Sequence, residues 1–169
     1  MLAALAVLAG LAAGTGCKSA TAQPAPAPAA APDARTSIPF DHSLHAGRNA
    51  IPCLACHTSA DKSPVAGIPS VRRCMGCHRF VASDKQPIQA LSQLFKDGQA
   101  PSWPRVYDLP DHVYFSHRMH IRAGLDCSKC HGNVAAMSKV TRVSPMKMGW
   151  CMTCHKQRGA STECITCHK

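Results

Sequence analysis

Five short segments of this sequence share the pattern Cys-x-x-Cys-His and together use ten of its eleven cysteines. They are Cys53, Cys56 and His57; Cys74, Cys77 and His78; Cys127, Cys130 and His131; Cys151, Cys154 and His155; and Cys164, Cys167 and His168. Two thiols about one helical turn apart can form thioether bonds with the two vinyl groups of one haem, and the histidine that follows then lies under the iron. The spacing therefore predicts five haem c groups, each with its motif histidine as the proximal ligand.

Two other uses of clustered cysteines stay open at this point. Structural zinc sites also pair Cys-x-x-Cys units, but they do not require a histidine after each pair. A disulfide scaffold suits a cysteine-rich exported chain, but it too leaves the five matched histidines unexplained. Covalent haem accounts for every position of the pattern and is the interpretation that we favour.

Five histidines lie outside the motifs, and five haems would require five distal ligands. These histidines are His42, His45, His112, His117 and His120. Within each of the pairs 42/45 and 117/120, both side chains project to one side of a helical turn and can reach different irons. His112 stands alone, and thioether sulfurs are alternative donors there. The candidates are Met119, Met137, Met146 and Met148, of which Met148 lies just before a motif. A Met/His pair would raise the haem potential relative to two histidines.

The formal charge of +10 at pH 7 would ordinarily suggest an anionic partner such as nucleic acid or a membrane surface. Five haems would bring about ten propionate carboxylates, which balance that charge. We therefore interpret the Lys and Arg residues as propionate partners and solvated surface. Basic residues are not interleaved with aromatic ones, so nucleic-acid binding is not expected.

An internal repeat organises these ligands. FDHSLHAGRNAIPCLACH (40–57) parallels FSHRMHIRAGLDCSKCH (115–131), and in each case a second motif follows, at Cys74 and at Cys151. The haem domain, 36–169, therefore divides into two dihaem modules (38–78 and 112–155), a connecting segment (79–111) and a terminal haem segment (156–169). We expect coil with short helices at the motifs and little or no β-sheet.

The connecting segment predicts one amphipathic helix over 85–97. Ile88, Leu91, Leu94 and Phe95 have helical spacing, Gly98 can end the helix and Asp84 is a candidate N-cap. Its apolar stripe is expected to pack internally. With only 5% aromatic residues, 13 Pro and 11 Gly, the chain has little material for a core, so the haems are expected to supply much of the buried apolar surface. A haem-free chain is therefore expected not to fold.

The N-terminal residues predict export. Residues 2–16 (LAALAVLAGLAAGTG) are apolar but shorter than the ~20 residues of a membrane span, so 1–17 is interpreted as a signal peptide of lipoprotein type, with Cys17 as the lipidated residue. Ordinary cleavage after Ala22 is the alternative, and it would remove Cys17. Residues 18–35 are rich in Ala and Pro and predict an extended tether.

The Phe-x-His-x-x-His…Cys-x-x-Cys-His pattern resembles the cytochrome c3/c7 class (class III/c7-like multihaem cytochromes c). That resemblance implies that His42 serves the haem at Cys53/Cys56 and His117 the haem at Cys127/Cys130, while His45 and His120 serve other haems. Over 38–168 the chain also resembles the pentahaem A subunit of alternative complex III. The stretches that carry this likeness are GIPSVRRCMGCH, PSWPRVYDLPDHVYFSHRMHIRAGLDCSKCHG and MGWCMTCHK, beside the first repeat.

The second resemblance implies an electron-transfer subunit of a menaquinol-oxidising complex on the periplasmic side of the bacterial inner membrane. Its partners would be an iron–sulfur subunit, integral membrane quinol-binding subunits and a periplasmic cytochrome or oxidase as acceptor. A stand-alone shuttle of the cytochrome c7 kind is the alternative. A catalytic reductase is disfavoured, because the sequence holds enough distal histidines to close every haem. The chain itself is thus expected to be an electron carrier without a catalytic site.

Overall fold

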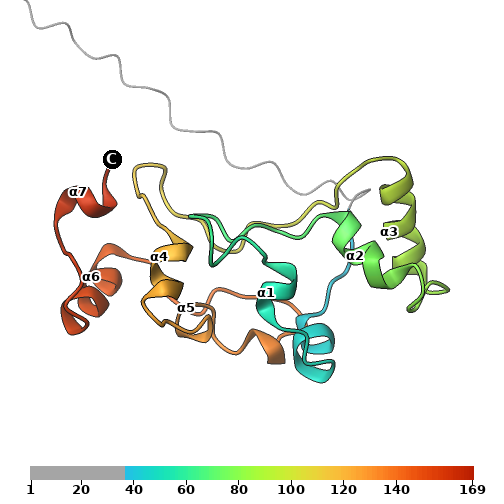
Figure 1. Ribbon diagram of the computed structural model, residues 1–169, viewed down its shortest axis with the longest axis horizontal. Coiled ribbons are helices and arrows are strands. Elements are labelled where there is room, and N and C mark those ends of the chain that lie inside the picture. Colours follow the sequence, from blue (N-terminus) through green and yellow to red (C-terminus); the bar gives the residue numbers. More distant parts are fainter. Residues whose placement is uncertain (1–36) are drawn as a thin grey trace, which may run out of the picture. The chain divides into compact units, whose positions relative to one another are not determined.

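The computed structural model describes residues 37–169, which form short helices joined by long coil segments (Figure 1). The predicted signal peptide, Cys17 and the tether all lie outside this range. In the described part there is no strand, and the β-type pairing consists of two isolated bridges, one between Ser37 and Ser102 and one between Val113 and His168. Among the helices of this part, none has both the length and the apolar character that a membrane span requires.

The described residues form seven α-helices, one π-helix and one 3-10 helix. They are a π-helix, η1 (Ser43–Arg48), then α1 (Cys53–Cys56), α2 (Val71–His78), α3 (Gln86–Lys96), α4 (His117–Arg122), α5 (Ser128–His131), a 3-10 helix, η2 (Val134–Ala136), α6 (Met148–Gln157) and α7 (Cys164–Cys167). Five of them coincide with the cysteine motifs, and η1 and α4 carry the two pairs of additional histidines. The expected architecture of coil with short helices at the motifs is confirmed.

Helix α3 lies where the sequence predicts it, one residue shorter at each end. Leu91 and Leu94 are buried, and α3 packs against α2, whose Met75 is also buried. The predicted N-cap is wrong: the cap position is Lys85, and Asp84 instead forms an exposed ion pair with the Lys85 ammonium at 3.2 Å. Pro87 in the first turn explains the shift, because its fixed φ suits a helix start and it has no N–H to be capped.

The core of the described residues is very small. Apart from Pro101, only four apolar residues are buried, namely Ala60, Met75, Leu91 and Leu94, and no large side chain is completely buried. Several large apolar side chains beside the motifs are instead exposed, including Phe80 and Ile165, both at 79%. The polypeptide alone therefore buries too little apolar surface to explain a stable domain of this length.

One backbone contact joins two distant parts of the chain. Helix η1 packs against η2, and the amide of Ser43 donates to the carbonyl oxygen of Met137 at 3.0 Å. At Gly47 the backbone comes so close to the carbonyl oxygen of Ala135 that a Cβ there would overlap it. Glycine at position 47 is thus required for the two segments to meet.

We expect Gly47→Ala to destabilise the protein by about 1–3 kcal/mol, because the opposing atom is backbone and cannot rotate away. Denaturant unfolding followed by circular dichroism measures the change. Gly149→Ala is the matched control, because nothing lies within 4 Å of a Cβ at that helical position. Equal stability of the two variants would show that the η1–η2 contact is not formed.

Candidate haem-binding sites

Each cysteine motif forms one turn of helix that brings its two thiols to the same side. The amides of His57, His131 and His168 donate to the carbonyl oxygen of the first cysteine of their own motif, each at 2.9 Å. Among the described residues, none of the ten motif cysteines forms a disulfide. Local helix formation thus presents two thiols and an imidazole together, as thioether attachment requires.

The second and fourth motifs differ from the others because each lies inside a longer helix, α2 or α6. The carbonyl oxygen of Cys77 accepts from the amides of Phe80 and Val81, both at 2.9 Å, where α2 ends. The carbonyl oxygen of Cys154 accepts from the amide of Arg158 at 3.0 Å, where α6 ends. The second cysteine of these two motifs therefore also takes part in ending its helix.

No thiol of the motifs is completely buried. Four are exposed, at Cys53, Cys77, Cys127 and Cys164, and six are half-buried, at Cys56, Cys74, Cys130, Cys151, Cys154 and Cys167. Cysteine is among the residues most often buried in proteins, so ten accessible thiols are unusual. Their accessibility fits sulfurs that are meant to bond to a group outside the polypeptide. Attachment of haem at each of these cysteines stays a prediction.

The histidines outside the motifs lie opposite those inside them. The distances between imidazole ring centroids are 6.0 Å for His45 and His78, 6.0 Å for His120 and His155, 6.3 Å for His117 and His131, and 5.6 Å for His112 and His168. Each pair joins one motif histidine with one additional histidine. Four of the five additional histidines therefore have a motif histidine facing them at nearly the same distance.

This distance fits a metal ion held between the two rings. With metal–nitrogen bonds of about 2 Å on opposite sides, the centroids of two axial imidazoles lie roughly 6 Å apart. Direct ring stacking would bring the centroids closer, as in Phe40 on His45 at 4.4 Å. The residues present therefore fit six-coordinate haem iron with two histidine ligands.

The fifth pair is His42 and His57. Burial, followed by the neighbouring His57 and His45 rings, lowers the pKa of His42 below its ordinary value. Burial and the nearby His117 and His57 rings likewise lower the pKa of His131. A lowered pKa keeps these imidazoles neutral at pH 7, and the neutral ring is the form that binds a metal.

Hydrogen bonds orient six of the imidazoles for ligation. In each, Nδ1 lies 2.6–3.0 Å from a backbone carbonyl oxygen. The pairs are His45 with Asp41, His57 with Gly67, His78 with Val81, His117 with Pro64, His120 with Ser116 and His155 with Ser161. Since a carbonyl oxygen only accepts, Nδ1 carries the proton and Nε2 is left free to bind iron.

The two Phe-x-His-x-x-His segments have the same local geometry. Phe40 stacks on His45 at 4.4 Å and meets His42 edge-on at 4.7 Å. Phe115 stacks on His120 at 4.5 Å and meets His117 edge-on at 4.9 Å. In both segments the phenyl ring therefore holds the two imidazoles at a fixed angle to each other. The sequence repeat carries this signal, although the role of the phenylalanines was not predicted from it.

Tyr107 and Ser144 are two further residues of the third site that sequence reasoning missed. Both hydroxyls donate to the carbonyl oxygen of Cys130, at 3.3 and 2.7 Å, and the Tyr107 ring meets His131 edge-on at 4.6 Å. They tie two coil segments to this motif. No sequence pattern marks them, because both come from segments without a repeat.

The fifth motif is held by the segment that contains His112. Val113 forms an antiparallel bridge with His168, and the amide of Tyr114 donates to the carbonyl oxygen of Cys167 at 2.7 Å. The His112 ring thereby lies opposite the His168 ring, nearly parallel to it. Met148, the alternative donor, is 63% exposed on α6. Of the candidates that the sequence left open, His112 is therefore the one that the fold brings to a motif histidine.

Two buried polar atoms near the second pair of histidines have no partner in the described residues. They are Ser116 Oγ and Arg118 Nε. Buried polar groups are nearly always hydrogen-bonded, and a guanidinium N–H is well suited to a carboxylate. A haem propionate would supply such an acceptor, so these atoms also fit the cofactor.

The arrangement does not fit zinc. A structural zinc site needs four converging ligands. Within residues 37–169, no group of three or more Cys, His, Asp or Glu side chains converges as a metal site would require. The imidazoles lie instead in facing pairs, as two axial ligands do.

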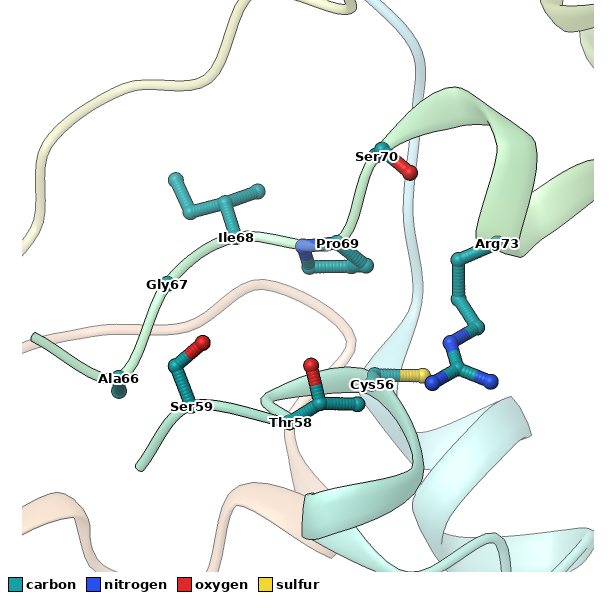
Figure 2. Close-up of a pocket in the computed structure, with 9 residues that line it drawn as sticks. All are labelled: Cys56, Thr58, Ser59, Ala66, Gly67, Ile68, Pro69, Ser70 and Arg73. Carbon is teal, nitrogen blue, oxygen red and sulfur yellow. The ribbon is translucent and has the colours of Figure 1, made fainter. Parts of the chain in front are cut away.

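A small cavity lies between the first two motifs (Figure 2). It is lined by the loop after α1 and by the residues before and within α2, with the Arg73 side chain reaching toward the Cys56 sulfur. Its volume of about 200 Å³ is below the roughly 300–1,000 Å³ of sites for drug-sized ligands. The cavity therefore gives no support for a substrate site, and it places a guanidinium beside the first two motifs.

Comparison with known proteins agrees with this chemistry. Residues 113–169 match the family of cytochrome c7 and related cytochromes c. The chain is 30% identical over 159 residues to the multihaem cytochrome c subunit of a menaquinone reductase from Nitratidesulfovibrio vulgaris (strain Hildenborough). That alignment covers 78% of this chain and 76% of the relative.

Proposed function

Because this chain belongs to the family of multihaem cytochromes c that includes that menaquinone reductase subunit, we propose that it carries five covalent haems and relays electrons in a membrane-associated, quinone-linked complex. Electron transfer by covalent haem is the activity that the family shares. The number of haems, their ligands, the partners and the location are the proposal. The observation that carries it is the opposition of four of the five additional histidines to one motif histidine each.

The proposed ligand sets follow from that opposition. The axial pairs are His57 with His42, His78 with His45, His131 with His117, His155 with His120, and His168 with His112, and the two cysteines of each motif attach the haem. In this scheme His42 and His117 serve the haem that follows them at once, whereas His45 and His120 serve the second haem of their module. The regular centroid distances support four of these pairs. The pair of His57 with His42 is supported by the influence of the His57 ring on the pKa of His42.

The attachment sites of the second haem of each module are part of the same proposal. Cys74 and Cys77 would bind the second haem, and Cys151 and Cys154 the fourth. Mass spectrometry of haem-bearing tryptic peptides tests each motif by itself. A peptide whose two cysteines each carry a thioether supports attachment there, and a peptide with two unmodified thiols refutes it for that motif.

Bound haem iron supplies the one-electron chemistry. The protein would hold the ligand imidazoles in fixed orientations, six of them through donation from Nδ1 to backbone carbonyl oxygens. With an imidazole on both faces, no iron position is left for a substrate. The residues of this chain then act by position and electrostatics alone, and none acts as an acid, base or nucleophile.

A catalytic multihaem reductase is the competing possibility, and it requires an open iron site. We expect the absorption spectrum of the purified protein to stay entirely low-spin when cyanide or nitric oxide is added, because both axial positions of every iron are filled. His112→Ala is the matched positive control, since it should create one iron that binds cyanide. Cyanide binding by the unaltered protein would instead indicate a catalytic haem.

The proposed partners are an iron–sulfur subunit and integral membrane quinone-binding subunits, with a periplasmic cytochrome or oxidase as acceptor. The likeness to the A subunit of alternative complex III favours menaquinol oxidation. The relative is named a menaquinone reductase, which favours the opposite direction of electron flow. Reduction of the haems by a menaquinol analogue in isolated membranes, compared with their oxidation by a menaquinone analogue, distinguishes the two.

The location is part of the same proposal. Residues 1–17 would direct export, Cys17 would carry the lipid and 18–35 would hold the haem domain at the periplasmic face of the inner membrane. Mass spectrometry of the mature N-terminus tests this. A diacylated Cys17 supports the anchor, whereas a chain that starts beyond residue 17 refutes it.

The assembly is tested by purifying the tagged chain from mildly solubilised membranes, with haem staining on a native gel and mass spectrometry of the co-migrating proteins. Recovery of an iron–sulfur subunit and quinone-binding membrane subunits supports a fixed relay. Recovery of the chain alone, as a haem-stained monomer, supports the alternative of a c7-like shuttle.

A further inference from the structure

Each pair of additional histidines connects two motifs. His42 and His45 lie on one turn at η1, and His45 faces the imidazole of the second motif while His42 neighbours that of the first. His117 and His120 lie on α4 and face the third and fourth motifs. The first haem would therefore lie next to the second, and the third next to the fourth, because the two histidines that would bind each couple share one helical turn.

The two modules contact each other reciprocally. The amide of Ser43, one residue after His42, donates to the carbonyl oxygen of Met137, six residues after His131. The amide of Arg118, one residue after His117, donates to the carbonyl oxygen of Ser63, six residues after His57. Each contact thus repeats the other with the modules exchanged, as at the isologous interface of a twofold dimer.

This reciprocal contact brings together the first motif of each module. The His117 amide and Nδ1 both lie near the Pro64 carbonyl oxygen, at 3.0 and 2.9 Å, so a ligand of the third haem rests on the loop that follows the first motif. On the other side, Gly47 lies against Ala135, in the loop that follows the third motif. These contacts form a pseudo-twofold interface around the first motif of each module. The first haem of each module would therefore lie at the centre of this interface.

Cysteines of different motifs also lie near one another, in the same combinations of motifs as the histidines and backbone contacts above. Burial and the nearby Cys53 thiol raise the pKa of Cys127, and burial and the Cys56 thiol raise that of Cys74. The cysteines of the first motif therefore lie near those of the second and the third motif, as the histidine pairs and backbone contacts also indicate.

The fifth motif is connected to the fourth by hydrogen bonds through Ser161. Ser161, whose carbonyl oxygen accepts from His155 Nδ1 at 2.6 Å, also forms a hydroxyl–hydroxyl hydrogen bond with Thr166 at 2.9 Å. His155 belongs to the fourth motif and Thr166 to the fifth. The guanidinium of Arg158, just beyond α6, donates to the carbonyl oxygen of Ala123 at the end of α4, which ties this end to the second module.

We propose that the two modules meet head to head, so that the haems lie in the spatial order second, first, third, fourth, fifth. In terms of attachment the order is Cys74, Cys53, Cys127, Cys151, Cys164. This order rests on the five-haem assignment of the proposed function. Its consequence is that the first haem in the sequence lies inside the relay, whereas the haem at Cys74 and Cys77 and the haem at Cys164 and Cys167 are its two ends. Redox partners therefore exchange electrons at those ends.

The order is tested by electrostatic coupling between haems in the complete holoprotein. His42→Met and His45→Met should each raise the potential of one haem, so that this haem is reduced first. Its added electron then makes reduction of the nearest haems harder, because the repulsion falls with distance. Proton NMR of the haem methyl groups during stepwise reduction measures the shift at each haem.

The two variants are expected to shift the potentials of different haems. With His42→Met, reduction of the Cys53 haem should shift both the Cys74 and the Cys127 haems to lower potential. With His45→Met, reduction of the Cys74 haem should shift mainly the Cys53 haem. A larger shift of the Cys127 haem in His45→Met than in His42→Met would overturn the order and favour the order of the sequence.

A second measurement needs no variant. Anomalous scattering at the iron edge from crystals of the unaltered holoprotein gives the iron positions directly. Five irons with the Cys53 iron between those at Cys74 and Cys127 support the head-to-head arrangement, and five irons in any other order overturn it while leaving the proposed function intact. Fewer than five irons would count against the proposed function and, with it, this order.

Discussion

Replacing His45 with alanine is expected to turn the haem at Cys74 and Cys77 high-spin and to leave the haem at Cys53 and Cys56 low-spin. In the sequence His45 directly precedes the first motif, but its ring faces His78 of the second motif at 6.0 Å. Its Nδ1 is held by the carbonyl oxygen of Asp41 at 2.8 Å. Loss of this ring removes one axial ligand and leaves the His78 iron with an open position.

Electron paramagnetic resonance of the oxidised protein would show a new high-spin component and the loss of one low-spin component of five. NMR contacts between the shifted haem and the β-protons of its attached cysteines identify which haem has changed. His42→Ala is the matched control, because it removes the other imidazole of the same turn and should change the Cys53/Cys56 haem. A high-spin Cys53/Cys56 haem in His45→Ala would refute the ligand scheme.

The haem-free chain is expected to lose essentially all of its folding stability. Buried apolar surface is the main favourable term in folding, and apart from Pro101 only four apolar residues of the described part are buried. Helix α3 has 11 residues, which is below the ~12–15 at which an isolated helix is even marginal in water. Covalently attached haem stays on the unfolded chain, but only the folded form would bury its apolar faces, so the haems would contribute directly to stability.

This expectation is measured on a chain in which all ten motif cysteines are replaced by serine, so that no haem is attached. Its circular dichroism should show no cooperative thermal transition, whereas the holoprotein should show one. Variants that lack one haem provide the control. Loss of the Cys164/Cys167 haem at the end of the chain should cost less stability than loss of the Cys53/Cys56 haem. A cooperative transition in the haem-free chain would show that the polypeptide has a core of its own.

The local parts of each site could be predicted because they depend on neighbouring residues only. The two thiols and the proximal imidazole of a motif share one helical turn, and α3 follows from apolar spacing that ends at Gly98. The cap of α3 was predicted wrongly, because Asp84 matched the preferred residue types while Pro87 moved the helix start by one residue. Tyr107 and Ser144 had no signal, because a coil residue becomes part of a site only through long-range contacts.

The sequence by itself determined which residues can do the chemistry: ten thiols, five motif imidazoles and five further histidines, two pairs of which share a helical turn. Only the tertiary structure decided which imidazole faces which, that His112 rather than Met148 lies opposite His168, and that the two modules meet through reciprocal contacts. The physical reason is range. Helical spacing sets the direction of side chains a few residues apart, whereas opposition across an iron and contact between modules depend on how distant coil segments fold back on each other.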